Sequence, residues 1–271
     1  MNRPEGSQAT QRELLATCVA AAVGAAEIIR RYAVDPSRIV WEEKSPVDFV
    51  TEVDRAAEES IMKVVAERHP DAVVVAEELS ADAVVTAELT FVADPLDGTT
   101  NFLHGCPHYA VSIAAVVGGD PVAGVVLNVP TGELFTATSG GGARRGGQPI
   151  SVSKTTVPSR SLLATGFPFK DHTQITPYLL GFESVVRATS GVRRAGAAAL
   201  DLADVACGRF DAFWELYLAP WDMAAGALLI REAGGIITDL QGAPAKVDHG
   251  AIVAGNPAMH AWLLQMLSRK S

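Results

Sequence analysis

The chain contains 271 residues, of which 48% are hydrophobic and 20% are charged, and its formal net charge at pH 7 is -9. This length fits one large domain or two closely packed halves with a substantial core. The acidic balance argues against nonspecific nucleic-acid binding, which requires clustered lysine and arginine side chains.

The cysteines and the N-terminal region indicate a cytoplasmic setting. The three cysteines, Cys18, Cys106 and Cys207, are scattered and show no CxxC or Cys/His spacing, which argues against a zinc site and favours a reduced compartment. The N-terminus is polar and lacks a signal-peptide pattern. The apolar stretch 14–29 is rich in alanine and contains Glu27, so it predicts a core-facing helix and no membrane span.

The first half of the chain predicts two helices followed by a mostly antiparallel sheet. A capping box that begins at Thr10 opens the first helix, and Thr51 opens the second. The tract 140–147 is rich in glycine but lacks the Lys-Ser/Thr ending of a nucleotide-binding loop, so a turn between strands is favoured over a ligand loop. In chain order we expect a helix over 10–32, a short strand at 40–41, a loop over 45–50, a helix from 51 to His69-Pro70, and strands over 72–76, 89–93, 110–117, 122–129 and 133–138.

The second half alternates strands and helices, which is typical of an α/β unit. Gly208 is expected to end one of these helices, and Asn256-Pro257 to open the last one. We therefore predict an N-terminal half over 1–150 and a C-terminal α/β half over 151–271. The expected elements are strands over 161–165, 210–216, 235–238 and 251–254 and helices over 176–188, 196–207 and 220–233, followed by the helix after Asn256.

The stretch Asp94-Pro95-Leu96-Asp97-Gly98-Thr99-Thr100-Asn101-Phe102 carries the strongest chemical signal. It places two carboxylates three residues apart, directly after an apolar run, and then supplies a glycine and two hydroxyl residues where a helix can begin. Paired aspartates at a strand end can hold hard divalent cations, and backbone N–H groups at a helix start can hold a phosphate oxygen. The motif therefore indicates phosphoryl chemistry.

Three further acidic residues stand at the ends of predicted elements. Glu77 follows a strand, whereas Asp54 and Asp222 lie in the first turns of two helices. Each has a structural alternative, because a first-turn aspartate complements the helix dipole and a strand-end glutamate is commonly solvated. A structural explanation fits the Asp94 and Asp97 pair less well, since a turn does not require the Gly-Thr-Thr that follows.

Four motifs in register resemble signatures of the inositol monophosphatase family. Residues 94–102 match the first signature, and Trp-Asp-Met-Ala-Ala-Gly at 221–226 matches the second. Residues 45–54 and 76–78 match two shorter ones, in the same order and at similar spacing. The resemblance extends from about Leu14 to Leu267.

This resemblance implies a fold and a metal site. The fold would be a mixed α/β (α+β) layered αβαβα sandwich of the inositol monophosphatase and fructose-1,6-bisphosphatase type, with two or three Mg²⁺ ions per subunit. By position, Glu77, Asp94 and the backbone carbonyl of Leu96 would hold one ion. Asp94, Asp97 and Asp222 would hold a second, and a third would lie near Glu77. Oxygen ligands suit Mg²⁺, and two cations would offset the charge repulsion that hinders hydroxide attack on a phosphate monoester.

The resemblance also implies roles in catalysis. Asp54, Thr99 and Glu77 would be catalytic, with Asp54 and Thr99 orienting and deprotonating a water that attacks in line. No GxSxG or similar nucleophile motif is present, so no covalent intermediate is expected. The substrate-binding residues implied are Asp97, Gly98, Thr99, Thr100, Gly196, Ala197, Ala198, Glu215 and Asp222.

Several assignments remain open on sequence alone. Glu215 fits either a ligand for substrate hydroxyl groups or a solvated strand-end residue, and Gly196-Ala197-Ala198 fits either a substrate contact or a close-packed helix start. Arg193 and Arg194 would meet an extra phosphate or be solvated. Lys44 stands one position away from the lysine spacing common in the family, which leaves its role near a third metal in doubt.

The leading function is hydrolysis of a small polyol phosphate, with myo-inositol 1-phosphate as the family default. Fructose-1,6-bisphosphatase, histidinol-phosphatase and nucleotide 3′-phosphatase activities share the metal site, and Gly98-Thr99-Thr100 favours the inositol branch. A regulatory protein that binds transcription proteins is the alternative from another class, although all acidic ligands are present here. The resemblance further implies a homodimer and lithium inhibition. From the charge and the composition of the first helix, no membrane or direct nucleic-acid partner is expected.

Overall fold

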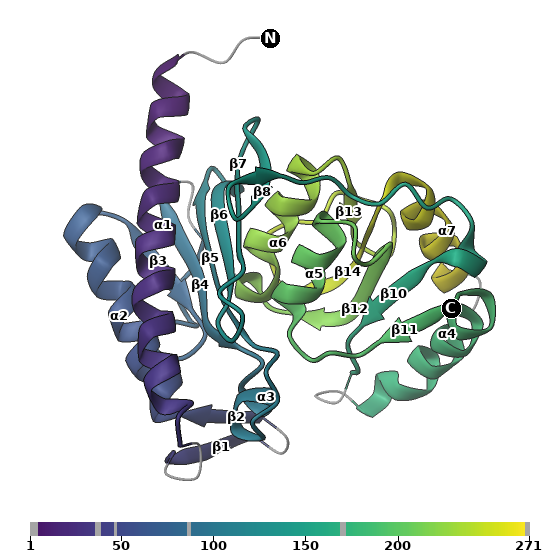
Figure 1. Cartoon of the computed structure of the whole chain (residues 1–271), viewed down its shortest axis with the longest axis horizontal. Coiled ribbons are helices and arrows are strands. Elements are labelled where there is room, and N and C mark those ends of the chain that lie inside the picture. Colours follow the sequence, from purple (N-terminus) through teal and green to yellow (C-terminus); the bar gives the residue numbers. More distant parts are fainter. Residues whose placement is uncertain (1–4, 36–38, 46–47, 86–87, 169–171, 269–271) are drawn as a thin grey trace.

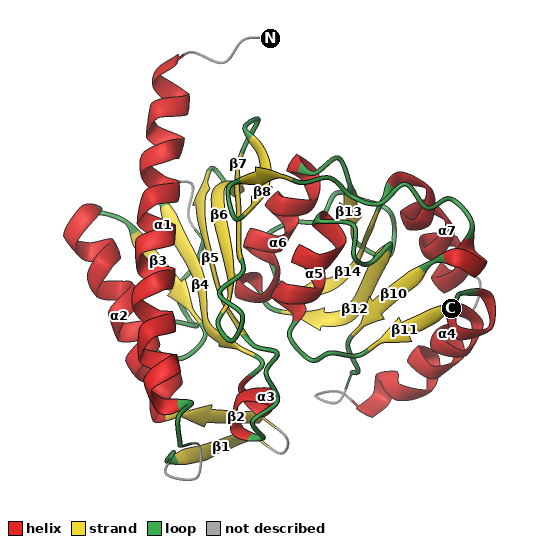
Figure 2. Cartoon of the chain, in the orientation of Figure 1, coloured by secondary structure: helices red, strands yellow, loops and turns green. Residues whose placement is uncertain are grey.

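The computed structural model describes residues 5–35, 39–45, 48–85, 88–168 and 172–268. Two β-sheets alternate with three layers of helices, as Figures 1 and 2 show. The expected layered αβαβα sandwich is confirmed. None of the described helices is both long enough and apolar enough to cross a lipid bilayer.

The first layer consists of two helices, α1 (Glu5–Tyr32) and α2 (Glu52–Arg68), which cover one face of the first sheet. Alanines at 21, 22, 25 and 26 are fully buried, and side chains this small allow α1 to lie close to the sheet. Thr51 is the N-cap of α2, and its hydroxyl accepts the N–H groups of Val53 and Asp54, as the sequence predicts.

The first sheet has seven strands in the order β3-β4-β5-β6-β7-β8-β9. β3 and β4 are parallel, whereas all other neighbours are antiparallel. Every residue of β4 is buried, as expected of a central strand covered on both faces. The strands are β3 (Val73–Ala76), β4 (Thr90–Asp97), β5 (Ala110–Val117), β6 (Asp120–Asn128), β7 (Leu134–Thr138), β8 (Gly142–Arg145) and β9 (Gln148–Pro149).

The middle layer, α5 (Ala198–Ala206) and α6 (Pro220–Glu232), lies between the two sheets. Both helices are buried almost all round, which is why their sequences are apolar without a polar face. A Cβ atom on Gly226 of α6 would lie 2.6 Å from the Leu202 side chain of α5, so glycine is needed for the two helices to pack this closely. Both helices come from the C-terminal half yet pack against the first sheet, so the two halves share one core.

The second sheet is mixed and has the order β11-β10-β12-β14-β13. Its outer face is covered by α4 (Ile175–Ala188) and α7 (Pro257–Ser268), which bury an aromatic cluster around Tyr178 and Trp214. The side-chain oxygen of Asn256 accepts the N–H groups of Ala258 and Met259, so Asn256 caps α7 as predicted. The strands are β10 (Leu162–Thr165), β11 (Gly191–Arg193), β12 (Ala212–Leu218), β13 (Ile236–Thr238) and β14 (Gly250–Gly255).

Five short elements complete the described part of the fold. β1 (Trp41–Ser45) and β2 (Asp48–Thr51) form an antiparallel hairpin near the short helix α3 (Thr99–Leu103). Single turns of 3₁₀-helix span Pro158–Arg160 and His172–Gln174.

Two sequence predictions are wrong in detail. The first helix starts at Glu5, so Thr10 lies inside it and does not cap it. Good helix formers at 8–14 continue the helix through this position. The segment 45–50, predicted as a loop, contributes to the β1–β2 hairpin, although Pro46 and Val47 lie outside the described residues.

The glycine-rich tract is a turn only in part, because strand β8 (Gly142–Arg145) lies within it between two tight turns. The N–H groups of Gly140 and Gly142 donate to the two carboxylate oxygens of Glu232, at 2.7 and 2.8 Å. The last residue of α6 therefore fills the anion-binding turn that this loop forms.

Candidate active site

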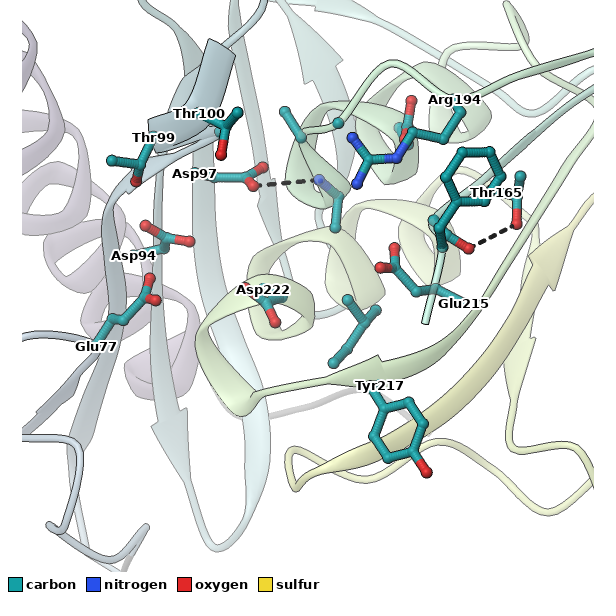
Figure 3. Close-up of a pocket in the computed structure, with 18 of the residues that line it drawn as sticks. Glu77, Asp94, Asp97, Thr99, Thr100, Thr165, Arg194, Glu215, Tyr217 and Asp222 are labelled. Carbon is teal, nitrogen blue, oxygen red and sulfur yellow. Dashed lines mark hydrogen bonds between the residues drawn. The ribbon is translucent and has the colours of Figure 1, made fainter. Parts of the chain in front are cut away.

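A cavity of about 400 Å³ opens where the two sheets and the middle helices meet. Figure 3 shows Glu77, Asp94 and Asp97 on one side of it, Arg194 and Glu215 on the other, and Asp222 between them. Of the predicted site residues, only Asp54 does not line this cavity. The predicted residues that do are Glu77, Asp94, Leu96, Asp97, Gly98, Thr99, Thr100, Gly196, Ala197, Ala198, Glu215 and Asp222.

The parallel pairing of β3 and β4 brings two of the carboxylates together. Ala76 is paired with Ala93, so Glu77 and Asp94 follow side by side at the carboxyl ends of the two strands. The pairing of β4 with β5 becomes irregular between Asp94 and Asp97, and Asp94 Oδ1 accepts the Leu96 N–H at 2.9 Å. This irregularity redirects the chain so that both aspartates reach the same cavity.

Asp97 connects the first sheet to the start of α5. Its two carboxylate oxygens accept the N–H groups of Ala198, at 3.2 Å, and Ala199, at 2.8 Å. Burial raises the pKa of Asp97 to about 7, while these N–H donors act in the opposite direction. Asp97 is therefore the cap of α5, supplied from 101 residues away in the sequence.

Asp222 reaches the cavity from the first turn of α6. Its Oδ2 accepts the Ala219 N–H at 2.7 Å, which fixes the carboxylate at the helix start. The Ser112 hydroxyl of β5 donates to the Trp221 carbonyl at 3.3 Å and ties this end of α6 to the first sheet.

The carboxylates raise one another's pKa values. Burial raises the pKa of Asp94 well above its ordinary value, and the negative charges of Glu77, Asp97 and Asp222 raise it further. The pKa of Asp222 is raised for the same reasons, with burial first and Glu77 and Asp97 next. A concentration of oxygen ligands and negative charge of this kind fits a hard divalent cation such as Mg²⁺.

The side chains do not enclose an ion by themselves. Within the described part of the chain, no three acidic, histidine or cysteine side chains stand close enough to surround one ion in the conformation observed. Mg²⁺ commonly keeps several waters and shares substrate phosphate oxygens, so one or two carboxylates per ion suffice. The donor set therefore fits Mg²⁺ in an open site.

The buried Asp54 and the half-buried Thr99 form a hydrogen-bonded pair at the edge of the cavity. The Thr99 hydroxyl lies 3.0 Å from Asp54 Oδ1 and 3.1 Å from the Leu96 carbonyl oxygen. Asp54 Oδ2 accepts the backbone N–H of Thr51 at 2.8 Å and also the Thr51 hydroxyl. Burial raises the pKa of Asp54 to about 6, against the effect of these donors. A carboxylate with this pKa can exchange a proton near neutral pH.

The first signature is also held by contacts that sequence reasoning missed. Asn101 Nδ2 donates to the carbonyl oxygens of His108, at 2.7 Å, Ala195, at 2.9 Å, and Gly196, at 3.3 Å. Gly98 has φ of +93°, and a Cβ there would lie 3.1 Å from the His108 carbonyl oxygen. Gly98 and Asn101 thus hold the turn after β4 close to His108 and to the residues that precede α5.

Glu58 is a second residue that sequence reasoning missed. It is fully buried, and its carboxylate accepts the N–H groups of Glu78, at 2.8 Å, and Leu79, at 2.9 Å. It therefore fixes the turn that carries Glu77. The signal in the sequence was a carboxylate within the apolar stripe of α2, four residues after Asp54.

The far end of the cavity has its own polar and aromatic residues. Glu215 of β12 lies so close to Gly166 that a Cβ at Gly166 would be 2.0 Å from its carboxylate. The Arg194 guanidinium lies over the Phe167 ring, 5.4 Å from its centre. Thr165, Gly166, Phe167, Pro168, Asp201, Tyr217 and Leu218, which the sequence did not single out, line this cavity too.

Three basic residues have roles that the sequence leaves open. Arg194 lines the cavity, whereas Arg193 is exposed at the end of β11 and does not line it. Lys44 lies in β1, and its side chain is outside the described part of the structure, so its role stays a prediction.

The fold and the site define a protein of layered αβαβα architecture with a carboxylate-rich cavity between its sheets. The chain belongs to the inositol monophosphatase family, whose model matches residues 10–271. It is 46% identical over 247 residues to the Nus factor SuhB of Pseudomonas aeruginosa. The matched residues make up 90% of this chain and 91% of that protein.

Solved structures of similar proteins have the same fold. The crystal structure of extragenic suppressor protein suhB from Bartonella henselae has a TM-score of 0.88 and 38% identity, over 96% of this chain and all of that one (100%). An inositol monophosphatase from Anabaena (Nostoc) has a TM-score of 0.84 and 36% identity, over 96% of this chain and 97% of that one.

Proposed function

We propose that this protein is a Mg²⁺-dependent phosphomonoesterase that hydrolyses a small polyol phosphate, with myo-inositol 1-phosphate as the leading candidate. The observation that supports it most is that Glu77, Asp94, Asp97 and Asp222, which three separate elements supply, line one cavity. Membership in the inositol monophosphatase family supports the phosphatase chemistry. The hydroxyl-rich substrate is inferred from Glu215 at the opposite end of the cavity.

The two ions would share Asp94. Glu77, Asp94 and the Leu96 carbonyl would hold one Mg²⁺, and Asp94, Asp97 and Asp222 a second. When bound, Mg²⁺ supplies positive charge that offsets the phosphate charge and lowers the pKa of nearby water.

The protein's own groups would position the water and the ester. The Thr99 hydroxyl can donate to Asp54, which leaves its lone pairs free to accept a hydrogen bond from the attacking water. A proton lost by that water would pass through Thr99 to Asp54, whose pKa of about 6 suits a general base. The N–H groups of Gly98 and Thr99 would hold phosphate oxygens, and Glu215 would accept a hydroxyl of the alcohol.

The experiment is phosphate release measured against Mg²⁺ concentration for the wild type, Asp97→Asn and Asp222→Asn. We expect EDTA to abolish release and both variants to need more Mg²⁺ and to turn over far more slowly. Circular dichroism and the Tm verify that the variants are folded. Asp97 of the first sheet and Asp222 of the middle layer are both proposed to hold the second ion. Full activity in either variant would therefore refute the shared metal site.

The substrate panel should include the related activities. Fructose 1,6-bisphosphate, histidinol phosphate and a nucleotide 3′-phosphate share the chemistry, and kcat/KM for each against myo-inositol 1-phosphate ranks them. A homodimer, lithium inhibition and a cytoplasmic location are further proposals from the family resemblance.

A regulatory role is the second candidate. The relative that is 46% identical is named Nus factor SuhB, a name that points to transcription. The same phosphate-release assay separates the two, since a purely regulatory protein would release no phosphate from any ester in the panel.

A further inference from the structure

One buried carboxyl group in the cavity wall has no explained partner. Asp201 of α5 is 2% exposed and lines the cavity. Its Oδ1 atom has no hydrogen-bond partner among the residues that the structure describes. Buried side-chain oxygens in native proteins are nearly always hydrogen-bonded to protein or ordered water, so an exception beside a cavity needs an explanation.

One ordinary role of an aspartate in the first turn of a helix, the capping of N-terminal N–H groups, is already filled in α5. Such a residue usually caps the N-terminal N–H groups. In this protein Asp97 already accepts the N–H groups of Ala198 and Ala199. Asp201 is therefore free of the capping role that its position suggests.

The packing of α5 fixes where Asp201 lies. The next residue, Leu202, is fully buried against Gly226 of α6, at a distance that leaves no room for a Cβ. The helix therefore cannot rotate to hide the Asp201 side chain or to expose it to solvent. Its carboxyl group is held at the cavity wall.

The charged groups around Asp201 come from both ends of the cavity, with Glu215 and Arg194 on one side and Asp97 on the other. Burial raises its pKa well above the ordinary value, and the charges of Glu215, Asp97 and Asp204 add to this, while Arg194 opposes it. Arg194 is itself stacked on Phe167, which also lines the cavity. A carboxyl oxygen that has no protein partner can accept a hydrogen bond from a hydroxyl group.

We propose that Asp201 is a further substrate-binding residue, which takes a hydroxyl group of the alcohol part of the ester alongside Glu215. This inference rests on the proposed phosphatase function and narrows its substrate class. Two hydroxyl-binding carboxyl groups on one side favour esters of polyols with several hydroxyls over esters of simple or aryl alcohols. A site that hydrogen-bonds substrate hydroxyls discriminates strongly against an analogue that lacks them.

The test compares Asp201→Ala with a matched variant of the same helix, Asp204→Ala. Asp204 is also largely buried but bonds the Arg209 guanidinium at 2.8 Å and does not line the cavity. Each protein is assayed with myo-inositol 1-phosphate and with p-nitrophenyl phosphate, whose alcohol part carries no further hydroxyl. Inorganic phosphate lacks the alcohol part of the ester, so its inhibition constant measures binding only at the end of the cavity that carries the proposed metal ligands.

For Asp201→Ala we expect a KM for myo-inositol 1-phosphate about tenfold higher, equivalent to about 1.4 kcal/mol. Three other quantities should stay within about twofold of wild type: kcat with this ester, the KM for p-nitrophenyl phosphate and the inhibition by inorganic phosphate. In the control variant Asp204→Ala, any change in KM should be the same for the two esters. Asp201→Asn, which retains a hydrogen-bonding side chain of the same size, should recover part of the loss. An unchanged KM for both esters, or an equal change for both, overturns the proposal.

A binding measurement separates this proposal from the proposed function. Calorimetry with free myo-inositol, in the presence of Mg²⁺ and phosphate, needs no turnover. If the wild type releases no phosphate from any ester, the phosphatase proposal fails. Myo-inositol binding that weakens in Asp201→Ala still supports the role of Asp201, and equal or absent binding refutes it.

Discussion

Replacement of Gly166 by alanine tests whether Glu215 selects the substrate. The added Cβ would lie 2.0 Å from Glu215 Oε1, whereas ordinary contact begins near 3.4 Å, so the carboxylate must move by about 1.4 Å (3.4 − 2.0). A hydrogen bond to a substrate hydroxyl does not survive such a shift, because its length range is only a few tenths of an ångström. Loss of a hydrogen bond to a charged group costs about 1.5–3 kcal/mol, which corresponds to roughly 10- to 150-fold in kcat/KM.

The fold should tolerate this change. Gly166 does not have the positive φ that alanine avoids, and the atom it meets is the end of a flexible side chain. Alanine also restricts the unfolded chain, so the Tm should not fall. The assay is kcat/KM for myo-inositol 1-phosphate, with p-nitrophenyl phosphate as the ester that should be unaffected. Gly250→Ala, where an added Cβ meets nothing within 4 Å, is the control. An unchanged kcat/KM for the inositol ester in Gly166→Ala would refute the reasoning.

Two further predictions concern groups behind the cavity wall. Glu58→Gln leaves one of two backbone N–H groups unpaired, so urea unfolding should show a loss of about 1–3 kcal/mol. Its Mg²⁺ requirement should rise because the turn of Glu77 loosens, whereas exposed Glu59→Gln should match wild type; equal stability of both variants would contradict this. Burial raises the pKa of Asp54 from 3.8 to about 6, so the folded protein retains a proton that the unfolded chain has lost. Proton binding at Asp54 therefore adds to the free energy of unfolding, by up to about 3 kcal/mol. This stabilisation is fully present below pH 4 and is lost as the pH rises through 6. Urea unfolding in EDTA at pH 4 to 8 should show a smaller decline for Asp54→Asn, and parallel curves would count against the raised pKa.

Local sequence signals predicted the elements near the cavity well. The strand over 110–117 has the predicted bounds, because an apolar run ended by Gly118-Gly119 leaves few alternatives. Thr51 caps α2 because the hydroxyl and carboxylate of its capping box lie within four residues. The start of α1 was not predictable in this way, since good helix formers precede Thr10 and let the helix run past it.

The far end of the cavity was harder to predict because its residues come together only through tertiary packing. Glu215 and Gly166 lie in different segments, and their contact depends on the pairing of β10 with β12. The sequence did not single out Asp201, and its position in the first turn of α5 gives no sign that Asp97 already binds the first N–H groups of this helix. Sequence reasoning about single positions cannot detect a role that another residue has already taken.

The signatures contain residues that serve packing as much as chemistry. In the first, Asn101 bonds three carbonyl oxygens, two of them in the segment that precedes α5. In the second, Gly226 allows α6 to approach Leu202 of α5. Both therefore act on α5, the helix whose first N–H groups bind Asp97. The carboxylates can share a cavity only when α5 and α6 lie in register between the two sheets, so a packing residue in either motif is as necessary to the site as an acidic one.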